Sequence, residues 1–84
     1  MPPPIEGTAA VAKRSLSVAG HRTSVSLEDA FWTALRDIAE ARGLPLAGLV
    51  AEIDRTRGEA NLSSAIRVHV LAFYRKAAGA SPAA

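Results

Sequence analysis

The chain contains no cysteine, and histidine is almost as scarce. Without thiols it can form neither a disulfide nor a thiolate metal site, and it is compatible with a reducing cytosolic compartment. The two histidines, His21 and His69, are too few and too far apart in the sequence to suggest a metal site. We therefore expect no metal and no cofactor.

Long apolar runs are also missing, and no segment approaches the roughly 18 apolar residues of a membrane-spanning helix. Residues 1–6 lack the basic start and apolar centre of a signal peptide, so we expect a cytoplasmic protein. The sequence has no glycine-rich phosphate loop and no nucleophile elbow, and its acidic pairs have the pattern of solvated helix faces. These absences predict a protein that is not an enzyme.

The 84 residues, 49% of them hydrophobic and 21% charged, fit one small globular domain. We expect residues 1–12, with three consecutive prolines, to form a flexible arm, residues 13–78 to fold, and residues 79–84 to form a flexible tail. A domain of this size barely builds a sufficient core, and such chains usually gain stability by forming oligomers.

Positive charge is concentrated in one part of the chain, although the net charge is only +2. No acidic residue lies between Glu6 and Glu28, whereas Lys13, Arg14 and Arg22 all lie in that interval. This local excess of positive charge favours a surface that binds nucleic acid.

Residues 21–27 alternate in the manner of a half-buried β-strand. The side expected to face the core carries Thr23, Val25 and Leu27, and the opposite side carries Arg22, Ser24 and Ser26. This is the one strand that the sequence indicates clearly. Because a single strand leaves its backbone groups unpaired, we expect it to pair with the same strand of a second copy.

Residues 13–18 also alternate, but their apolar residues have the opposite parity. Leu16 and Val18 are even-numbered, whereas Val25 and Leu27 are odd-numbered, so one flat strand cannot place all four on one face. A bulge or bend at Gly20 would resolve this switch.

Three helices are expected after the strand. Apolar periodicity predicts them at residues 28–42, at residues 46–54 or a few residues beyond, and from residue 61 or 62 to about residue 78. Gly43 suits a helix C-cap, Pro45 a first helical turn, and Asn61 an N-cap. The third helix is apolar over much of its circumference, which predicts burial on two sides and hence a subunit interface. Phe31 and Trp32 are expected to anchor the core or that interface.

A two-stranded antiparallel ribbon fits the major groove of B-DNA, and its outward side chains can reach base edges. We therefore predict base contacts from Arg22, Ser24 and Ser26, with Arg22 the best reader because its guanidinium can bond guanine O6 and N7 together. Two alternatives stay open at this point. The polar side is equally typical of a solvated sheet face, and the spacing of Ser26 to Asp29 favours a capping role for Ser26.

Phosphate contacts are expected from two regions. Lys13 and Arg14 precede the strand, and the third helix begins with hydroxyl and amide side chains at a positive dipole end, where phosphates bind well. The predicted phosphate-contacting residues are Lys13, Arg14, Asn61, Ser63, Ser64 and Arg67. Ordinary helix capping is the competing interpretation for Asn61 and the two serines.

Three groups of residues carry a resemblance to a known family. They are Lys13-Arg14-Ser15 followed by Gly20-His21-Arg22-Thr23-Ser24; Leu27-Glu28 followed by Phe31-Trp32 and Leu35; and Asn61-Leu62-Ser63-Ser64-Ala65 followed by Arg67-Val68. Over about residues 13–76 the chain resembles a bacterial branch of the ribbon-helix-helix superfamily of DNA-binding proteins.

The resemblance implies an intertwined homodimer, mainly α with one β-strand, in which one strand from each subunit forms an intermolecular antiparallel ribbon. It also implies that a helix N-terminus grips the phosphate backbone, from either the second helix or the extra third helix. We expect a dimeric, nucleoid-associated DNA-binding protein that regulates transcription. The alternative is a protein-interaction dimer, for instance an antitoxin-like partner, that does not read DNA sequence.

Overall fold

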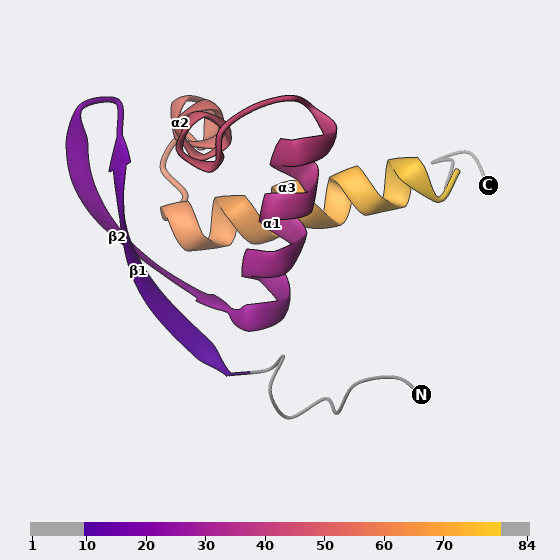
Figure 1. The fold of residues 1–84 in the computed structure, drawn as a ribbon, viewed down its shortest axis with the longest axis horizontal. Helices are drawn as coiled ribbons and strands as arrows, with labels where there is room; N and C mark the ends of the chain where they lie inside the picture. Colours follow the sequence, from indigo (N-terminus) through magenta and orange to yellow (C-terminus); the bar gives the residue numbers. More distant parts are fainter. Residues whose placement is uncertain (1–9, 80–84) are drawn as a thin grey trace.

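The structure is a computed structural model that describes residues 10–79. It contains strands β1 (Val11–Val18) and β2 (His21–Glu28), followed by helices α1 (Asp29–Ala41), α2 (Leu46–Thr56) and α3 (Leu62–Ala77). The strands form a curved hairpin with all three helices on one side of it (Figure 1). Most of the expected arm and tail, residues 1–9 and 80–84, lies outside the described residues, but β1 begins two residues before the predicted domain boundary.

The prediction of a single strand is wrong, because β1 and β2 pair with each other in an antiparallel hairpin. The register places Leu16 opposite Thr23 and Val18 opposite His21. The partner of β2 in this structure is therefore a strand of the same chain. The expected pairing of this strand with the same strand of a second copy stays a prediction.

The parity switch, for which a bulge or bend was expected, is explained by a two-residue hairpin turn. Ala19 and Gly20 both have positive φ, 52° and 84°, as the central residues of a type I′ turn require. A two-residue turn pairs even-numbered residues with odd-numbered ones, so Val18 and Val25 share one face of the hairpin. The change from even-numbered to odd-numbered apolar residues across Ala19 and Gly20 therefore indicated a hairpin.

Ala19 is the one non-glycine residue with positive φ in the described part of the chain, and this conformation is strained for alanine. We expect Ala19→Asn to raise the free energy of unfolding by about 0.5–1 kcal/mol, because asparagine tolerates the left-handed region. Gly20→Ala should act in the opposite direction through backbone strain alone, since a Cβ there would meet nothing within 4 Å. Urea denaturation of both variants measures the two effects, and a loss of stability in Ala19→Asn would contradict the assigned turn.

The core lies between the inner face of the hairpin and the helices. Its fully buried side chains come from every helix and from β2, and the largest is Trp32 of α1, which is 1% exposed. The Trp32 indole N–H donates a hydrogen bond of 2.9 Å to the carbonyl oxygen of Ala12. Trp32 thus joins α1 to β1 and satisfies its own buried polar atom, as an aromatic core anchor should.

The predicted helices are confirmed to within about two residues at each end. Gly43 follows α1 with φ of 68°, in agreement with its expected place at the C-terminus. The predicted N-cap of α3 is confirmed, because the Asn61 side-chain oxygen accepts a hydrogen bond of 2.8 Å from the Ser64 backbone N–H.

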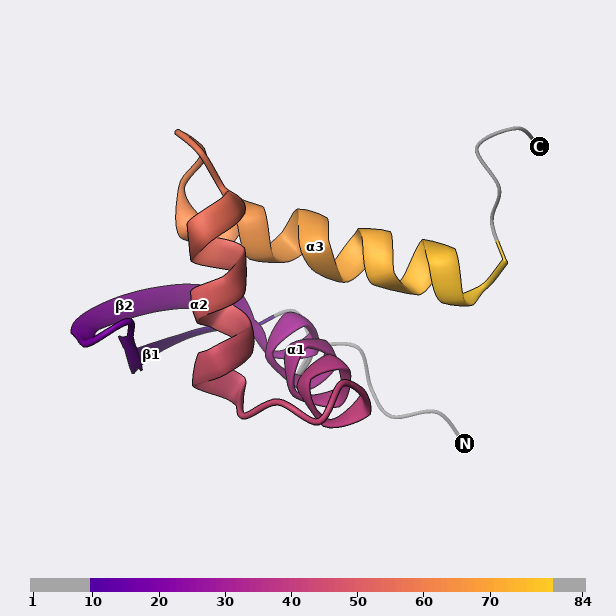
Figure 2. The ribbon, with the colours of Figure 1, turned by 90° about the horizontal axis from the view of Figure 1, so that it is seen from above.

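The two sides of α3 differ sharply in burial. Ile66 and Val70 are buried against the rest of the fold, whereas Val68, Leu71 and Tyr74 are 67%, 57% and 42% exposed. The C-terminal part of α3 also extends beyond α1 and α2, as two perpendicular views show (Figures 1 and 2). Within one chain, therefore, only one side of α3 is covered.

Candidate nucleic-acid interface

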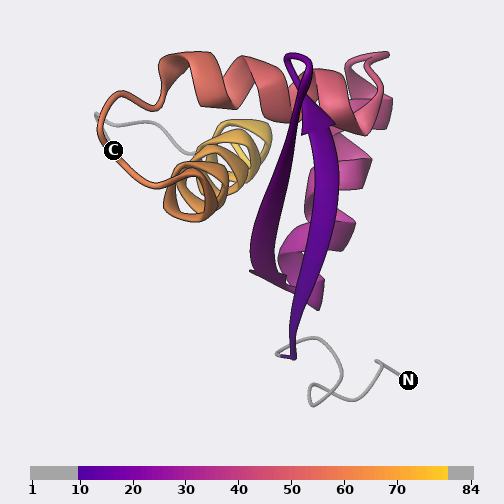
Figure 3. The same ribbon diagram turned by 90° about the vertical axis from the view of Figure 1, so that its left-hand side faces the viewer.

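The outer face of the hairpin is a short, polar ribbon surface. Figure 3 looks onto this face, with the three helices behind it. Strand alternation and the register place Lys13, Ser15, Ser17, Arg22, Ser24 and Ser26 on this face. All are exposed except Ser26, which is half-buried. We call these six residues the ribbon face.

The structure brings together all three residues that were predicted to contact bases. Arg22, Ser24 and Ser26 lie on β2, and across the hairpin they face Ser17, Ser15 and Lys13 respectively. Ser15 and Ser17 were not predicted as contact residues, because without a hairpin turn the odd-numbered residues of β1 were not expected on the same face as Arg22. The ion pairs of the described residues involve neither Lys13 nor Arg22, so both cations remain available to a ligand.

The predicted capping role of Ser26 is wrong. The N-cap of α1 is Glu28, and no side chain makes a capping hydrogen bond there. Ser26 lies instead within β2, opposite Lys13, because strand pairing continues as far as Glu28. The residue that sequence spacing assigned to the helix therefore belongs to the ribbon face.

The first turn of α3 lies close to the tip of the hairpin. Leu62 and His21 line the same small depression, together with Ala19 of the turn and Arg57. Asn61 and Ser64 are engaged in the N-cap, and Ser63 lies between them at the positive end of the helix. By contrast, α2 begins at Pro45 without a side-chain cap, so α3 offers the more polar of the two helix starts.

Two of the predicted phosphate-contacting arginines have partners within the chain. Arg67 donates a hydrogen bond of 3.0 Å to Glu28 Oε1, and its guanidinium carbon lies 5.9 Å from the centre of the Phe31 ring. Arg14 lies on the inner face of β1, with its guanidinium carbon 5.3 Å from the centre of the Trp32 ring. Arg14 is therefore not on the ribbon face with Arg22.

The contact between Arg67 and Glu28 predicts a pH effect. The hydrogen bond from Arg67 holds the pKa of the Glu28 carboxyl below its ordinary value of 4.5. A carboxyl whose pKa is lower in the folded state stabilises the fold above the ordinary pKa, and this contribution is lost as pH falls through the lower folded value. The effect should be small because both side chains are about one third exposed.

We therefore expect Glu28→Gln to lower the thermal midpoint slightly at pH 7 and to leave it unchanged near pH 2. Thermal unfolding of both proteins between these values measures the difference. Arg67→Gln should show the same pH dependence, since it removes the other partner. A difference that grows on acidification would contradict the assignment.

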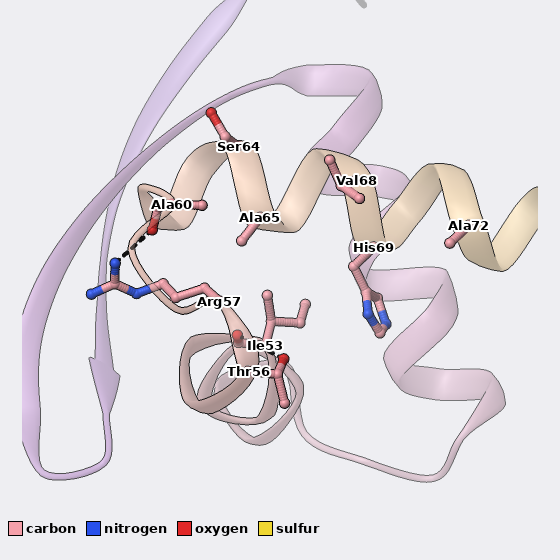
Figure 4. Close-up of a pocket in the computed structure, with 9 residues that line it drawn as sticks. All are labelled: Ile53, Thr56, Arg57, Ala60, Ser64, Ala65, Val68, His69 and Ala72. Atoms are coloured by element: carbon pink, nitrogen blue, oxygen red, sulfur yellow. Dashed lines mark hydrogen bonds between the residues drawn. The ribbon is translucent and has the colours of Figure 1, made fainter.

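Away from the hairpin, a depression with a volume of about 400 Å³ lies between α2 and α3 (Figure 4). Arg57 at its border is already held by Asp54 at 2.6 Å and by the Ala60 carbonyl oxygen at 2.7 Å. The lining of the depression is mostly apolar and includes no carboxylate.

In the part of the chain that the structure describes, no group of three histidine, cysteine or acidic residues could hold a metal ion. None of the described helices has the length and apolarity needed to cross a membrane.

Comparison with known proteins shows which domain family has this hairpin and its helices. A family model described as a ribbon-helix-helix domain matches residues 11–74. Among solved structures, the chain is similar to an uncharacterized protein from Bordetella pertussis Tohama I, with 36% sequence identity and a TM-score of 0.74. The similarity covers 93% of this chain and 67% of that chain. No curated protein matches the chain.

Proposed function

The chain belongs to the family of ribbon-helix-helix domains, and on this basis we propose that it is a dimeric DNA-binding protein that regulates transcription. The ribbon face enters the major groove of double-stranded DNA. The observation that carries the proposal is the ribbon face itself, an exposed antiparallel pair of strands with two cations and four hydroxyl groups. A two-stranded ribbon of this kind fits the major groove, and these side chains can bond base edges.

In this proposal Arg22, Ser24 and Ser26 contact bases. The α3 start at Asn61, Ser63 and Ser64 meets the phosphate backbone, supported by its position beside the hairpin tip and by the dipole of the helix. The remaining predicted phosphate contacts are Lys13, Arg14 and Arg67. Of these, Lys13 lies on the ribbon face and Arg14 adds positive potential from its place beside Trp32, while the charge of Arg67 is offset by Glu28.

The proposal includes a homodimer and no enzymatic activity. Exposed apolar side chains on α3, namely Val68, Leu71 and Tyr74, support association, because a second subunit would remove them from water. A cytoplasmic protein bound to the nucleoid would meet its DNA directly. Ribbon-helix-helix domains are typically regulators without catalytic activity, and the ribbon face has the chemistry of binding.

The test is DNA affinity as a function of salt, measured by fluorescence anisotropy on a random duplex. We expect the wild type to bind at low salt, with a logarithm of affinity that falls linearly with the logarithm of salt concentration. Replacing Lys13 and Arg22 together with alanine should weaken binding about tenfold or more and flatten the slope.

The matched control replaces Arg75 and Lys76 with alanine. This pair also removes one arginine and one lysine, but it lies in the last turn of α3, far from the hairpin (Figure 1). Binding should stay within about threefold of the wild type, since no cation of the ribbon face is lost. An absence of binding at low salt, or equal losses in the two double variants, would reject the proposal.

A second candidate function is favoured by the exposed side of α3. A protein-interaction dimer, such as an antitoxin-like partner, would use this apolar surface and would not need the ribbon cations. Its partner binding should persist when Arg22 is replaced with alanine and should be lost in Leu71→Glu. DNA binding by the wild type that depends on Arg22 decides against this candidate.

A further inference from the structure

Two depressions meet along one side of α3. The depression between α2 and α3 has a volume of about 400 Å³, and a second one of about 470 Å³ adjoins it and reaches Arg42, which follows α1. His69 and Ala72 line both of them. We call the pair of depressions that join at these two residues the α3 groove. Figure 4 shows Ile53 of α2 and Ala65 of α3 facing each other across the first depression, with His69 farther along α3.

The groove follows one side of the C-terminal half of α3. His69, Phe73 and Lys76 line the second depression at intervals of four and three residues, so they lie on the same side of the helix. The exposed apolar residues Leu71 and Tyr74 line a different depression and do not line the groove. The α3 groove therefore lies beside the apolar surface that these two residues form.

The lining of the α3 groove contains basic side chains and no carboxylate. Its basic residues are Arg42, Arg57, His69 and Lys76. Both arginines are already engaged, because Arg42 donates hydrogen bonds to Glu52 and Arg57 donates one to Asp54. By contrast, the ion pairs of the described residues do not involve Lys76. A largely apolar groove thus has one uncompensated cation at the end nearest the C-terminus of α3.

We propose that the α3 groove binds a small amphipathic monocarboxylate, with its apolar tail between α2 and α3 and its carboxylate at Lys76 and His69. Small-ligand sites typically have volumes of roughly 300–1,000 Å³, apolar walls and a few polar groups that fix orientation. Both depressions have volumes in this range. The single negative charge of the ligand matches the single uncompensated ammonium group, and the imidazole N–H of His69 adds a hydrogen-bond donor. This inference goes beyond DNA binding and does not rest on it.

The test is isothermal titration calorimetry of the full chain with decanoate, at concentrations below those at which decanoate forms micelles. We expect saturable binding, because the ligand has an apolar tail for the walls of the groove and a carboxylate for Lys76. Decyltrimethylammonium has a tail of the same length and the opposite charge. It should bind at least about tenfold more weakly, because its cation would meet Lys76.

Two pairs of variants test whether decanoate lies in the groove. Lys76→Gln should weaken decanoate binding about tenfold through the loss of a charge-assisted hydrogen bond. Arg75→Gln removes a neighbouring charge that does not line the groove, and its affinity should stay within about twofold of the wild type. Ala72→Trp should fill the groove and abolish binding, whereas Arg75→Trp adds the same ring outside it and should preserve binding. All three positions are exposed, and circular dichroism verifies that each variant is folded.

Four results would overturn the inference. The first two are an absence of saturable decanoate binding and equal binding of decanoate and decyltrimethylammonium. The third is an unchanged affinity in Ala72→Trp, which would place decanoate elsewhere on the chain. The fourth is dissociation of a dimer by decanoate or by Ala72→Trp, measured by sedimentation equilibrium, which would show that a second subunit occupies the groove. DNA affinity as a function of salt decides the proposed function separately.

Discussion

Replacing Trp32 with alanine is expected to lower the free energy of unfolding by about 3–5 kcal/mol, the usual cost of removing a large buried aromatic side chain. Trp32 is 1% exposed and is the largest fully buried side chain of the described residues. The change also removes the hydrogen bond from the indole N–H to the Ala12 carbonyl oxygen, which loosens β1 from α1. Because small domains have about 5–15 kcal/mol of stability in total, this loss is a large fraction of the total and should lower the thermal midpoint strongly.

The control is Trp32→Phe, which keeps an aromatic ring in the core but removes the indole N–H. This variant should lose about 1–2 kcal/mol, mostly from the lost indole hydrogen bond and the smaller ring. Urea denaturation monitored by circular dichroism measures both variants without relying on tryptophan fluorescence. A loss below about 1 kcal/mol in Trp32→Ala would show that the core does not depend on this contact between α1 and β1.

Replacing Ser24 with glutamate is expected to weaken DNA binding by about a hundredfold or more while leaving the fold intact. Ser24 is exposed and lies at the centre of the ribbon face, opposite Ser15. A carboxylate there would face the acceptor-rich floor of the major groove and the negative potential of the phosphates. Fluorescence anisotropy at low salt measures the loss, and thermal unfolding verifies the fold.

Two control variants show whether the loss of binding depends on where the negative charge is placed and whether it depends on the charge or on the lost hydroxyl group. Thr33→Glu adds the same charge to an exposed site on α1, behind the hairpin, and should weaken binding by no more than about threefold. Ser24→Ala removes the hydroxyl group without adding charge and should cost about 0.5–1.5 kcal/mol of binding. Equal effects of the two glutamate substitutions would indicate that the ribbon face does not contact DNA.

The helices and their ends could be predicted because the signals that define them are local. Apolar spacing located α1, α2 and α3, and the Asn61 cap depends only on atoms within one turn of helix. The polar side of β2 was likewise evident from alternation alone. These features involve residues close together in the sequence, where backbone geometry leaves few alternatives.

The hairpin was missed although its signal was present. Ala19-Gly20 is not a common pair for a two-residue turn, and its strain is tolerated only because the paired strands and the core hold both sides. The same pairing extends β2 to Glu28 and removes Ser26 from the start of α1. A local capping pattern was therefore overridden by strand pairing between residues far apart in the sequence.

The sequence by itself determined three helices, one ribbon strand with Arg22 and Ser24 on its polar side, and a resemblance to a family of DNA-binding proteins. Only the tertiary structure decided that β1 pairs with β2 in a hairpin of the same chain. It also decided that Arg67 is held by Glu28 across 39 positions of sequence. The physical reason is that periodicity and caps act over a few residues, whereas these contacts exist only once packing brings distant segments together.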